Sequence, residues 1–243
     1  MKILAIIPAR GGSKRIPHKN IKKFNGQPII KYSIDAAIHS GVFCETMVST
    51  NDKTIADISL ALDAKVPFMR SQENSSDTTG TATVLIEVLE EYKKLGREFD
   101  YVCCIYPTSP FLTPERLKTA ERMIIEKKAD AVFPVMSCPA PIQKALKIED
   151  GMVKMFWPEN YATRTQDMEP SYNDSNQFYF LKTDSFLKQR TLYLKHSLPL
   201  IVPQFEGQDI NTEEDWEMAE LKYKLLKKIR RQYERKVSRS IQS

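Results

Sequence analysis

The sequence predicts a three-layer α/β/α fold built on a mainly parallel β-sheet. Apolar, β-branched runs of strand length alternate with segments whose apolar residues recur at helical spacing. One run, 101–105, is apolar throughout, which is typical of a central parallel strand covered on both faces. Another, 3–8, is followed at once by two glycines and a cluster of cations. In such a sheet, ligands bind at the carboxyl ends of the strands, so the residues after each strand are candidates for a binding site.

The expected elements follow in chain order. Strands are expected at 3–8, 45–50, 65–68 (short, at a sheet edge), 101–105, 131–133, 177–181 and 200–202. Helices are expected from Pro28 to Gly41, over 55–62, over 84–92, after a cap at Thr113, and from Thr212, where residues 212–215 approximate a capping box. Residues 138–170 break the alternation and carry a hairpin signal, so we expect a small lobe that leaves the sheet.

The chain is expected to divide into a main domain, 1–223, which contains the lobe, and a basic C-terminal tail, 224–243. Residues 222–243 hold nine Lys or Arg against one acid, a net charge of +8; the whole chain carries +5, so the rest carries −3. A basic tail can bind nucleic acid, but only Tyr223 and Tyr233 are interleaved as stacking aromatics. A solvated helix end is therefore the favoured interpretation, with nucleic-acid binding as the alternative.

Composition narrows the class of protein. With 243 residues, 42% hydrophobic and 28% charged, the chain can bury a core as one soluble globular domain. No run approaches the roughly 18 apolar residues of a membrane span, and the N-terminus enters a strand without a signal peptide, so we expect no membrane partner and a cytoplasmic location. The four cysteines lack C-x-x-C spacing and are expected to be small core residues rather than metal ligands or disulfides.

The segment after the first strand has the composition of a phosphate-binding loop. Gly11–Gly12 can adopt positive φ and carries no Cβ atoms, so backbone N–H groups can converge on an anion. No acidic residue precedes Asp35, and the clustered cations are Arg10, Lys14, Arg15 and Lys19. Neither G-x-x-x-x-G-K-[ST] nor G-x-G-x-x-G is present, so neither a P-loop NTPase nor a dinucleotide site is indicated. The alternative is a solvated basic loop, the usual role of a charge run.

Residues 8–17, Pro-Ala-Arg-Gly-Gly-Ser-Lys-Arg-Ile-Pro, followed by Lys19-Asn20-Ile21, resemble the signature of the cytidylyltransferases that make CMP-sialic acids, and within that family the pseudaminic acid branch. The resemblance continues to about residue 223. It implies a nucleotide-binding sheet and transfer of CMP from CTP to the anomeric hydroxyl of a nine-carbon acidic sugar, with release of pyrophosphate. It also implies Mg²⁺ as cofactor and a homodimer in which the 138–170 lobe crosses to the partner.

The resemblance implies a nucleotide site at the glycine loop. Its triphosphate-binding positions are Ala9, Arg10, Gly11, Gly12, Ser13, Lys14, Lys19 and Asn20. Among these, Arg10 and Lys19 are expected to neutralise charge in the transition state, and Asn20 to bind the nucleotide. Arg70 and Thr81 stand where the family contacts the cytosine end. From the residues alone, Arg70 could equally be a surface charge and Thr81 an ordinary first-turn helix residue.

The expected metal site is Asp209-Ile210-Asn211. Residues two apart on an extended segment point to the same side, so both can face one cation. The family usually has Asp at both positions, and Asn211 departs by offering a neutral carbonyl oxygen. Because Mg²⁺ needs only one or two protein carboxylates beside phosphates and water, Asp209 alone could suffice.

For the sugar, the resemblance implies contacts from Lys144, Arg164, Tyr106, Gln177 and Tyr179. Lys144 and Arg164 match positions where the family uses cations, and a guanidinium binds a carboxylate well. Tyr106 stands where sialic acid enzymes commonly carry Gln, which favours the pseudaminic branch. Asn176 departs from a usual Gly, and Gln177 and Tyr179 could equally be structural strand residues.

Two further readings stay open at this point. The same reaction could use N-acetylneuraminic, legionaminic or 3-deoxy-octulosonic acid. The chain could also be a nucleotide-binding scaffold without catalysis, with Asn211 as the damaged position. Release of pyrophosphate distinguishes the scaffold from the enzymes.

Overall fold

The computed structural model describes the backbone of residues 1–241 and the side chains of residues 1–229 and 232. A seven-stranded sheet lies at its centre, with the strand order β11-β6-β10-β5-β1-β4 and with β9 paired to β6. The strands are β1 (Ile3–Pro8), β4 (Glu45–Ser49), β5 (Tyr101–Ile105), β6 (Ala131–Ser137), β9 (Tyr172–Asp174), β10 (Phe178–Lys182) and β11 (Ser197–Ile201). The β1–β4, β1–β5 and β6–β11 pairs are parallel, whereas β10 runs antiparallel between β5 and β6. The start of β10 therefore lies at the carboxyl edge of its neighbours.

Helices cover both faces of this sheet, which confirms the predicted three-layer fold. The helices are α1 (Ile29–Ser40), α2 (Lys53–Ala61), α3 (Thr81–Lys94), α4 (Pro114–Glu126), α5 (Thr183–Gln189) and α6 (Glu213–Ile241). Alternate side chains of β1 point to opposite faces of the sheet and pack in different cores. Ile7 belongs to a core that includes Ile34 of α1 and Leu117 of α4, and Ile6 to a core that includes Leu85 of α3.

The helix ends follow the local signals in the sequence. Thr113 accepts a hydrogen bond from the Arg116 N–H and caps α4, with Pro114 as the first helical residue. Gly41 ends α1 in the left-handed conformation with φ 65°. Thr212 and Asp215 exchange backbone and side-chain bonds at the start of α6, which is the predicted capping box with Asp in place of Glu.

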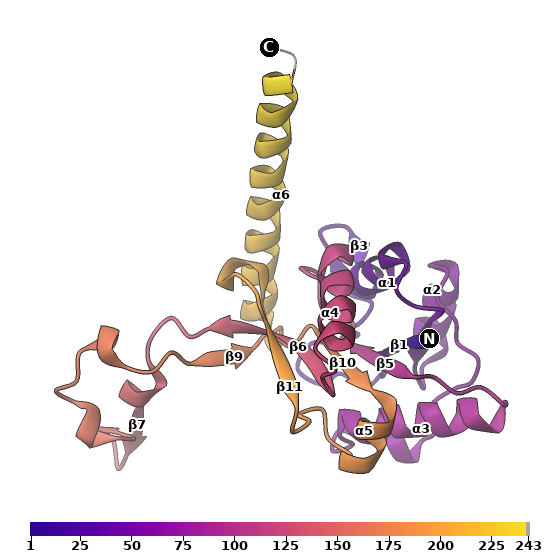
Figure 1. Ribbon diagram of the computed structural model, residues 1–243, viewed down its shortest axis with the longest axis horizontal. Helices are drawn as coiled ribbons and strands as arrows, with labels where there is room; N and C mark the ends of the chain where they lie inside the picture. The colour runs from indigo at the N-terminus through magenta and orange to yellow at the C-terminus, as the bar shows by residue number, and fades with distance from the viewer. Residues whose placement is uncertain (242–243) are drawn as a thin grey trace.

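A third apolar cluster lies under the beginning of α6. Trp216 packs edge-on against Phe24, with ring centroids 5.7 Å apart, and Ile210 and Phe111 belong to the same cluster. Figure 1 shows α6 leaving this contact and projecting from the body. The helix continues without a break past residue 223, and the side chains of most of the basic tail lie outside the described residues.

The 138–170 segment leaves the sheet as predicted and extends away from the body, in a different direction from α6 (Figure 1). It contains the expected hairpin, β7 (Leu146–Glu149) with β8 (Met152–Met155), and three short 3₁₀ helices at Ile142–Lys144, Pro158–Asn160 and Thr165–Asp167. Its apolar side chains are largely exposed; Ile148, for example, is 79% exposed.

Several sequence-based expectations need correction. The strand expected at 65–68 is reduced to a single bridge between Lys65 and Met47, because Pro67 has no N–H to continue a ladder. The last strand begins at Ser197, earlier than expected, and β9 and the short pair β2 (Lys23–Phe24) and β3 (Gln27–Pro28) were not predicted. Cys103 and Cys104 are buried core residues, but Cys44 is exposed. Within residues 1–241, no helix is long and apolar enough to cross a membrane.

Candidate active site

A cleft of about 650 Å³ opens at the carboxyl edge of the sheet. Its walls come from the loop after β1, the segment 70–81, the residues that follow β5, Asn176 before β10, and the segment before α6. The predicted site residues that line it are Arg10, Ser13, Lys14, Lys19, Asn20, Arg70, Thr81, Tyr106, Asp209 and Asn211. Residues up to 201 positions apart are thus brought together by the order of the parallel strands.

The glycine loop is held by the end of β4. Ala9 is fully buried and donates its N–H to the Ser49 carbonyl at 2.9 Å, and the Gly11 N–H donates to Asn51 Oδ1 at 3.1 Å. A Cβ atom on Gly11 would lie 2.5 Å from Asp52 Oδ2. Neither Gly11 nor Gly12 has a positive φ, so the expected need for positive φ is wrong, whereas the expected need for a residue without Cβ holds at Gly11. Gly11 is required by the close approach of Asp52.

The phosphate-loop cations are not free in the cleft. Arg10 and Lys14 both pair with the carboxylate of Asp77, Lys14 at 2.5 Å. These two hydrogen bonds, first from Lys14 and then from Arg10, hold the pKa of Asp77 below its ordinary value. The sequence offers no acid near the loop, but the fold supplies one from a segment 67 positions away.

Lys19 and Asn20, at the end of the loop, hold it in place by hydrogen bonds. Lys19 donates to the Ile210 carbonyl, and burial lowers its pKa while the charge of Asp209 acts in the opposite direction. Asn20 is 8% exposed and donates to the Arg10 carbonyl at 2.9 Å. Asn20 therefore fixes the backbone that carries Arg10, and Lys19 links the loop to the segment of the expected metal site.

Arg70, Thr81 and Tyr106 form another part of the wall. Arg70 is 7% exposed and donates to the Ser49 carbonyl at 2.5 Å, so it is not a surface charge. Burial lowers its pKa to about 10, which leaves the guanidinium charged at neutral pH. Thr81 Oγ1 lies 3.4 Å from the Tyr106 hydroxyl, and burial raises the pKa of Tyr106 to about 12. Tyr106 is therefore a neutral phenol at physiological pH.

Asp209 and Asn211 meet as the spacing predicts. Asn211 donates its side-chain N–H to Asp209 Oδ2, and its Oδ1 accepts a bond from Arg15 at 3.0 Å. One carboxylate in a cleft lined by cations suits Mg²⁺, which takes one or two carboxylates together with substrate oxygens and water. Among the residues described, no group of three His, Cys, Asp or Glu could hold a metal by itself.

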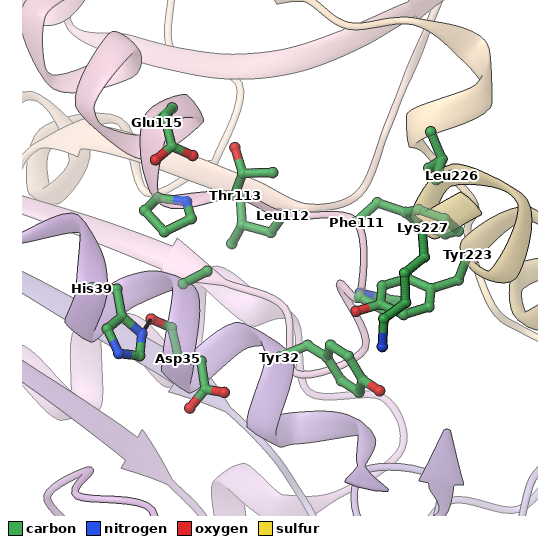
Figure 2. A pocket seen from close by; sticks show the side chains of 13 residues that line it. Tyr32, Asp35, His39, Phe111, Leu112, Thr113, Glu115, Tyr223, Leu226 and Lys227 are labelled. Atoms are coloured by element: carbon green, nitrogen blue, oxygen red, sulfur yellow. Dashed lines mark hydrogen bonds between the residues drawn. The ribbon is translucent and has the colours of Figure 1, made fainter. Parts of the chain in front are cut away.

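A second cavity, of about 510 Å³, lies between α1, the start of α4 and α6. Figure 2 shows its aromatic side chains, Tyr32, Phe111 and Tyr223, with Lys227 beside them and His39, Asp35 and Glu115 toward the other end. It shares no lining residue with the cleft. The loop cations, Asp209 and Asn211 all face the cleft, so the cleft is the candidate active site.

Comparison with known proteins identifies the family of this chain. The family model described as "Cytidylyltransferase" matches residues 4–234. The chain belongs to the cytidylyltransferase family. This cytidylyltransferase is 38% identical over 226 residues to the pseudaminic acid cytidylyltransferase of Campylobacter jejuni subsp. jejuni serotype O:2, a match that covers 93% of this chain and 97% of the relative.

The names of other similar proteins indicate different sugar substrates. A CMP-N,N'-diacetyllegionaminic acid synthase of Legionella pneumophila is 32% identical over 229 residues, covering 90% of this chain and 95% of the relative. Among solved structures, a CMP:2-keto-3-deoxy-manno-octonic acid synthetase complexed with CTP superposes with a TM-score of 0.67 at 16% identity, covering 91% of this chain and 98% of the other. The structural similarity confirms the fold of the cytidylyltransferase.

The remaining predicted residues lie away from the cleft in the cytidylyltransferase. Lys144 and Arg164 are in the lobe, where Arg164 pairs with Asp167 at 2.7 Å. Gln177 is 2% exposed and contacts Arg116 and the Glu206 carbonyl. Tyr179 is equally buried and donates to Asp174, behind Tyr106, with the two rings edge to face at 5.9 Å.

Sequence reasoning missed the groups that hold the site together. Asp77 lines the cleft, whereas Arg116 and Glu206 do not line it and pair with each other. Asp77 lies in a polar, loop-like stretch, and Arg116 lies in the first turn of an amphipathic helix. Neither residue therefore carries a local sequence pattern that predicts a role in the site. Their roles depend on partners that only the fold brings near.

Proposed function

We propose that this cytidylyltransferase transfers CMP from CTP to the anomeric hydroxyl of pseudaminic acid, releasing pyrophosphate and forming the CMP-activated sugar. The observation that carries the proposal is its identity to pseudaminic acid cytidylyltransferases over nearly the whole length of both chains. The cleft supports it, because cations from the β1 loop face a cavity large enough for a nucleotide and an acceptor.

The nucleotide side works mainly by position and charge. The acceptor oxygen forms a bond to the α-phosphorus as the bond to pyrophosphate breaks, and negative charge grows on the phosphate oxygens. Arg10, Lys14 and Lys19 are proposed to neutralise this charge. Arg70, fixed by Ser49, and Thr81 are proposed to bind the cytidine end. A cleft that holds these groups in place before the substrate binds lowers the cost of reaching the transition state.

The proposed cofactor is Mg²⁺, held by Asp209 with the help of Asn211. When bound, the ion would supply positive charge to the phosphate oxygens. Lys19 holds the same segment, since it donates to the carbonyl of Ile210, between the two metal-site residues. Asn211 is neutral and already bonded to Arg15, so Asp209 is proposed as the main ligand.

The acceptor side is proposed to include Tyr106, with Tyr179 as its support. Tyr106 presents a neutral hydroxyl to the cleft, and Tyr179 packs against its ring. Lys144 and Arg164 belong to the 138–170 lobe and do not line this cleft, so we propose that they act on the site of a second copy. The exposed apolar hairpin residues Ile148 and Val153, 79% and 66% exposed, are the proposed dimer contact.

The test is pyrophosphate release with CTP and Mg²⁺ against pseudaminic, N-acetylneuraminic, legionaminic and eight-carbon ulosonic acids. Release with pseudaminic acid alone is the expected result. The legionaminic acid synthase among the relatives makes legionaminic acid the second candidate, and release with that acid would keep the chemistry but change the substrate. Binding of CTP without release of pyrophosphate in the presence of any of these acids would favour a nucleotide-binding scaffold without catalysis.

The dimer is tested separately by light scattering at micromolar concentration. The expected mass is twice that of the 28.0 kDa chain. Ile148→Glu with Val153→Glu is expected to give a monomer with little activity, because the second copy would no longer supply Lys144 and Arg164. A monomeric variant with full activity would contradict the proposed exchange.

A further inference from the structure

Arg116 connects two walls of the cleft without lining it. This residue lies in the first turn of α4, its side chain is only 9% exposed, and its guanidinium contacts three different segments. It donates to the Phe111 carbonyl at 3.2 Å, to Gln177 Oε1 at 2.8 Å and to Glu206 Oε2 at 2.5 Å. A planar guanidinium suits this task, since its donors diverge in fixed directions.

One of these contacts leads to the Tyr106 wall. The Gln177 carbonyl accepts the Tyr106 N–H at 2.9 Å and the Ser109 hydroxyl at 3.2 Å. The Gln177 side chain bonds Arg116 on one side and donates to the Glu206 carbonyl at 2.8 Å on the other. Gln177 therefore ties the segment after β5 to Arg116 and to the opposite wall.

The other contact leads to the segment that carries Asp209. Glu206, 25% exposed, begins this segment and pairs with Arg116. Beyond it, Gly207 packs closely against the thioether of Met136, and Lys222 donates to the Gly207 carbonyl at 3.3 Å. The position of Asp209 thus depends on anchors at 206 and 207 as well as on those at 210 and 211.

We propose that Arg116 is a positioning residue of the active site, which sets the separation between the Tyr106 wall and the Asp209 segment through Gln177 and Glu206. The inference rests on the proposed function, in which Tyr106 faces the acceptor and Asp209 the metal and phosphates. It also gives Gln177 a role other than contact with the sugar: Gln177 and Glu206 are the two arms of this brace.

The expected effect is on turnover more than on nucleotide binding. The cations that hold the triphosphate lie in the β1 loop and keep their contacts when Arg116 is changed. A shift of about 1 Å between acceptor and phosphate costs on the order of a hundredfold in rate. Arg116→Met is therefore expected to lower kcat at least about tenfold, with the dissociation constant of CTP changed less than about threefold. Arg116→Lys, which keeps the charge but not the three diverging donors, is expected to be intermediate.

The experiment combines kinetics with hydrogen exchange. In Arg116→Met, backbone amides of residues 204–211 are expected to exchange about tenfold faster, because this segment loses an anchor while the rest of the sheet is retained. Glu206→Gln removes the negative charge of one arm and Gln177→Met removes the acceptor of the other, both with little change in shape, and each is expected to give part of both effects. These two variants keep the test open if Arg116→Met folds poorly.

Arg97→Met is the matched control. Arg97 pairs with Glu45 at 2.9 Å, but Glu45 is the first residue of β4, at the amino edge of the sheet away from the cleft. This control is expected to change stability without changing kcat or exchange in 204–211. Unchanged kcat per folded enzyme in the Arg116 variants, or a loss of CTP affinity as large as the loss of kcat, would overturn the inference. If the wild-type enzyme releases no pyrophosphate, the proposed function fails, and exchange in 204–211 still decides whether the brace exists.

Discussion

Gly11→Ala gives a direct test of how the glycine loop after β1 is held. The new Cβ would lie 2.5 Å from Asp52 Oδ2 and 2.9 Å from Asp52 Cβ, closer than real side chains approach. Either the loop moves, at an overpacking cost of about 1–3 kcal/mol, or Asp52 moves. Because Asp52 accepts the Ile55 N–H at 3.1 Å as the cap of α2, its displacement costs about 1 kcal/mol.

Thermal unfolding and CTP titration measure the two consequences. For a chain of this size, each kcal/mol lowers Tm by about 2–4 °C, so a fall of several degrees is expected together with weaker CTP binding. Gly12→Ala is the matched control, since the nearest atom to its new Cβ is Arg10 Nη1 at 3.9 Å, an ordinary contact. Its Tm is expected to stay within about 1 °C of the wild type.

A second-site change tests the cause. Asp52→Ser keeps a capping oxygen and removes the carboxylate oxygen at 2.5 Å from the new Cβ, but it retains the Cβ of residue 52 at 2.9 Å, so the double variant is expected to recover only part of the lost stability. The reasoning is refuted if Gly11→Ala loses no more stability than Gly12→Ala, or if Asp52→Ser gives no recovery in the Gly11→Ala background.

Three further changes probe the charges of the cleft. Asp77→Asn is expected to tighten CTP binding severalfold by calorimetry, because Arg10 and Lys14 lose the internal carboxylate that competes with the triphosphate. Lys19→Arg is expected to extend activity to higher pH: burial lowers the pKa of Lys19, so it loses its charge at lower pH than an exposed lysine, whereas arginine stays charged. Asn211→Asp is expected to lower the Mg²⁺ concentration that gives half-maximal activity, since a second carboxylate joins Asp209.

Each of these expectations has an opposing result. Glu73→Gln, an exposed carboxylate on the same segment as Asp77 but outside the cleft, is the control for the first and should leave CTP binding unchanged. Weaker CTP binding by Asp77→Asn would mean that the carboxylate orients the cations. If activity falls at the same high pH in Lys19→Arg as in the wild type, loss of charge on Lys19 is not the cause of that fall. If Asn211→Asp leaves the Mg²⁺ dependence of activity unchanged, Asn211 does not lie beside the metal.

The parts of the fold that the sequence predicts are those with local causes. Strand β5 is apolar throughout because it is covered on both faces, and the caps at Thr113 and Gly41 depend on neighbouring residues. The loop from Arg10 to Asn20 is also local, and its cations do line the cleft. Pattern and spacing suffice where the partner is a few positions away.

The contacts that escape prediction are distant in sequence. Gln177 was expected at the sugar, but its side chain meets Arg116, 61 positions away, and is buried. Asp77 reaches Arg10 across 67 positions. Which partner a buried amide such as that of Gln177 bonds depends on the fold, and no periodicity in the sequence encodes it. The assignments of Lys144 and Arg164, the dimer, the domain boundary at 223 and a cytoplasmic location stay predictions.

The antiparallel direction of β10 has a consequence for how this enzyme can diversify. The end of β6 and the start of β10 lie at the same edge of the sheet, the carboxyl edge of β6. The 138–170 lobe is therefore an insertion whose two ends are both fixed at that edge. Its length and sequence can change without moving any strand register or any residue of the β1 loop. The contacts that the lobe makes can therefore change in evolution while the part of the cleft that the β1 loop lines keeps its structure.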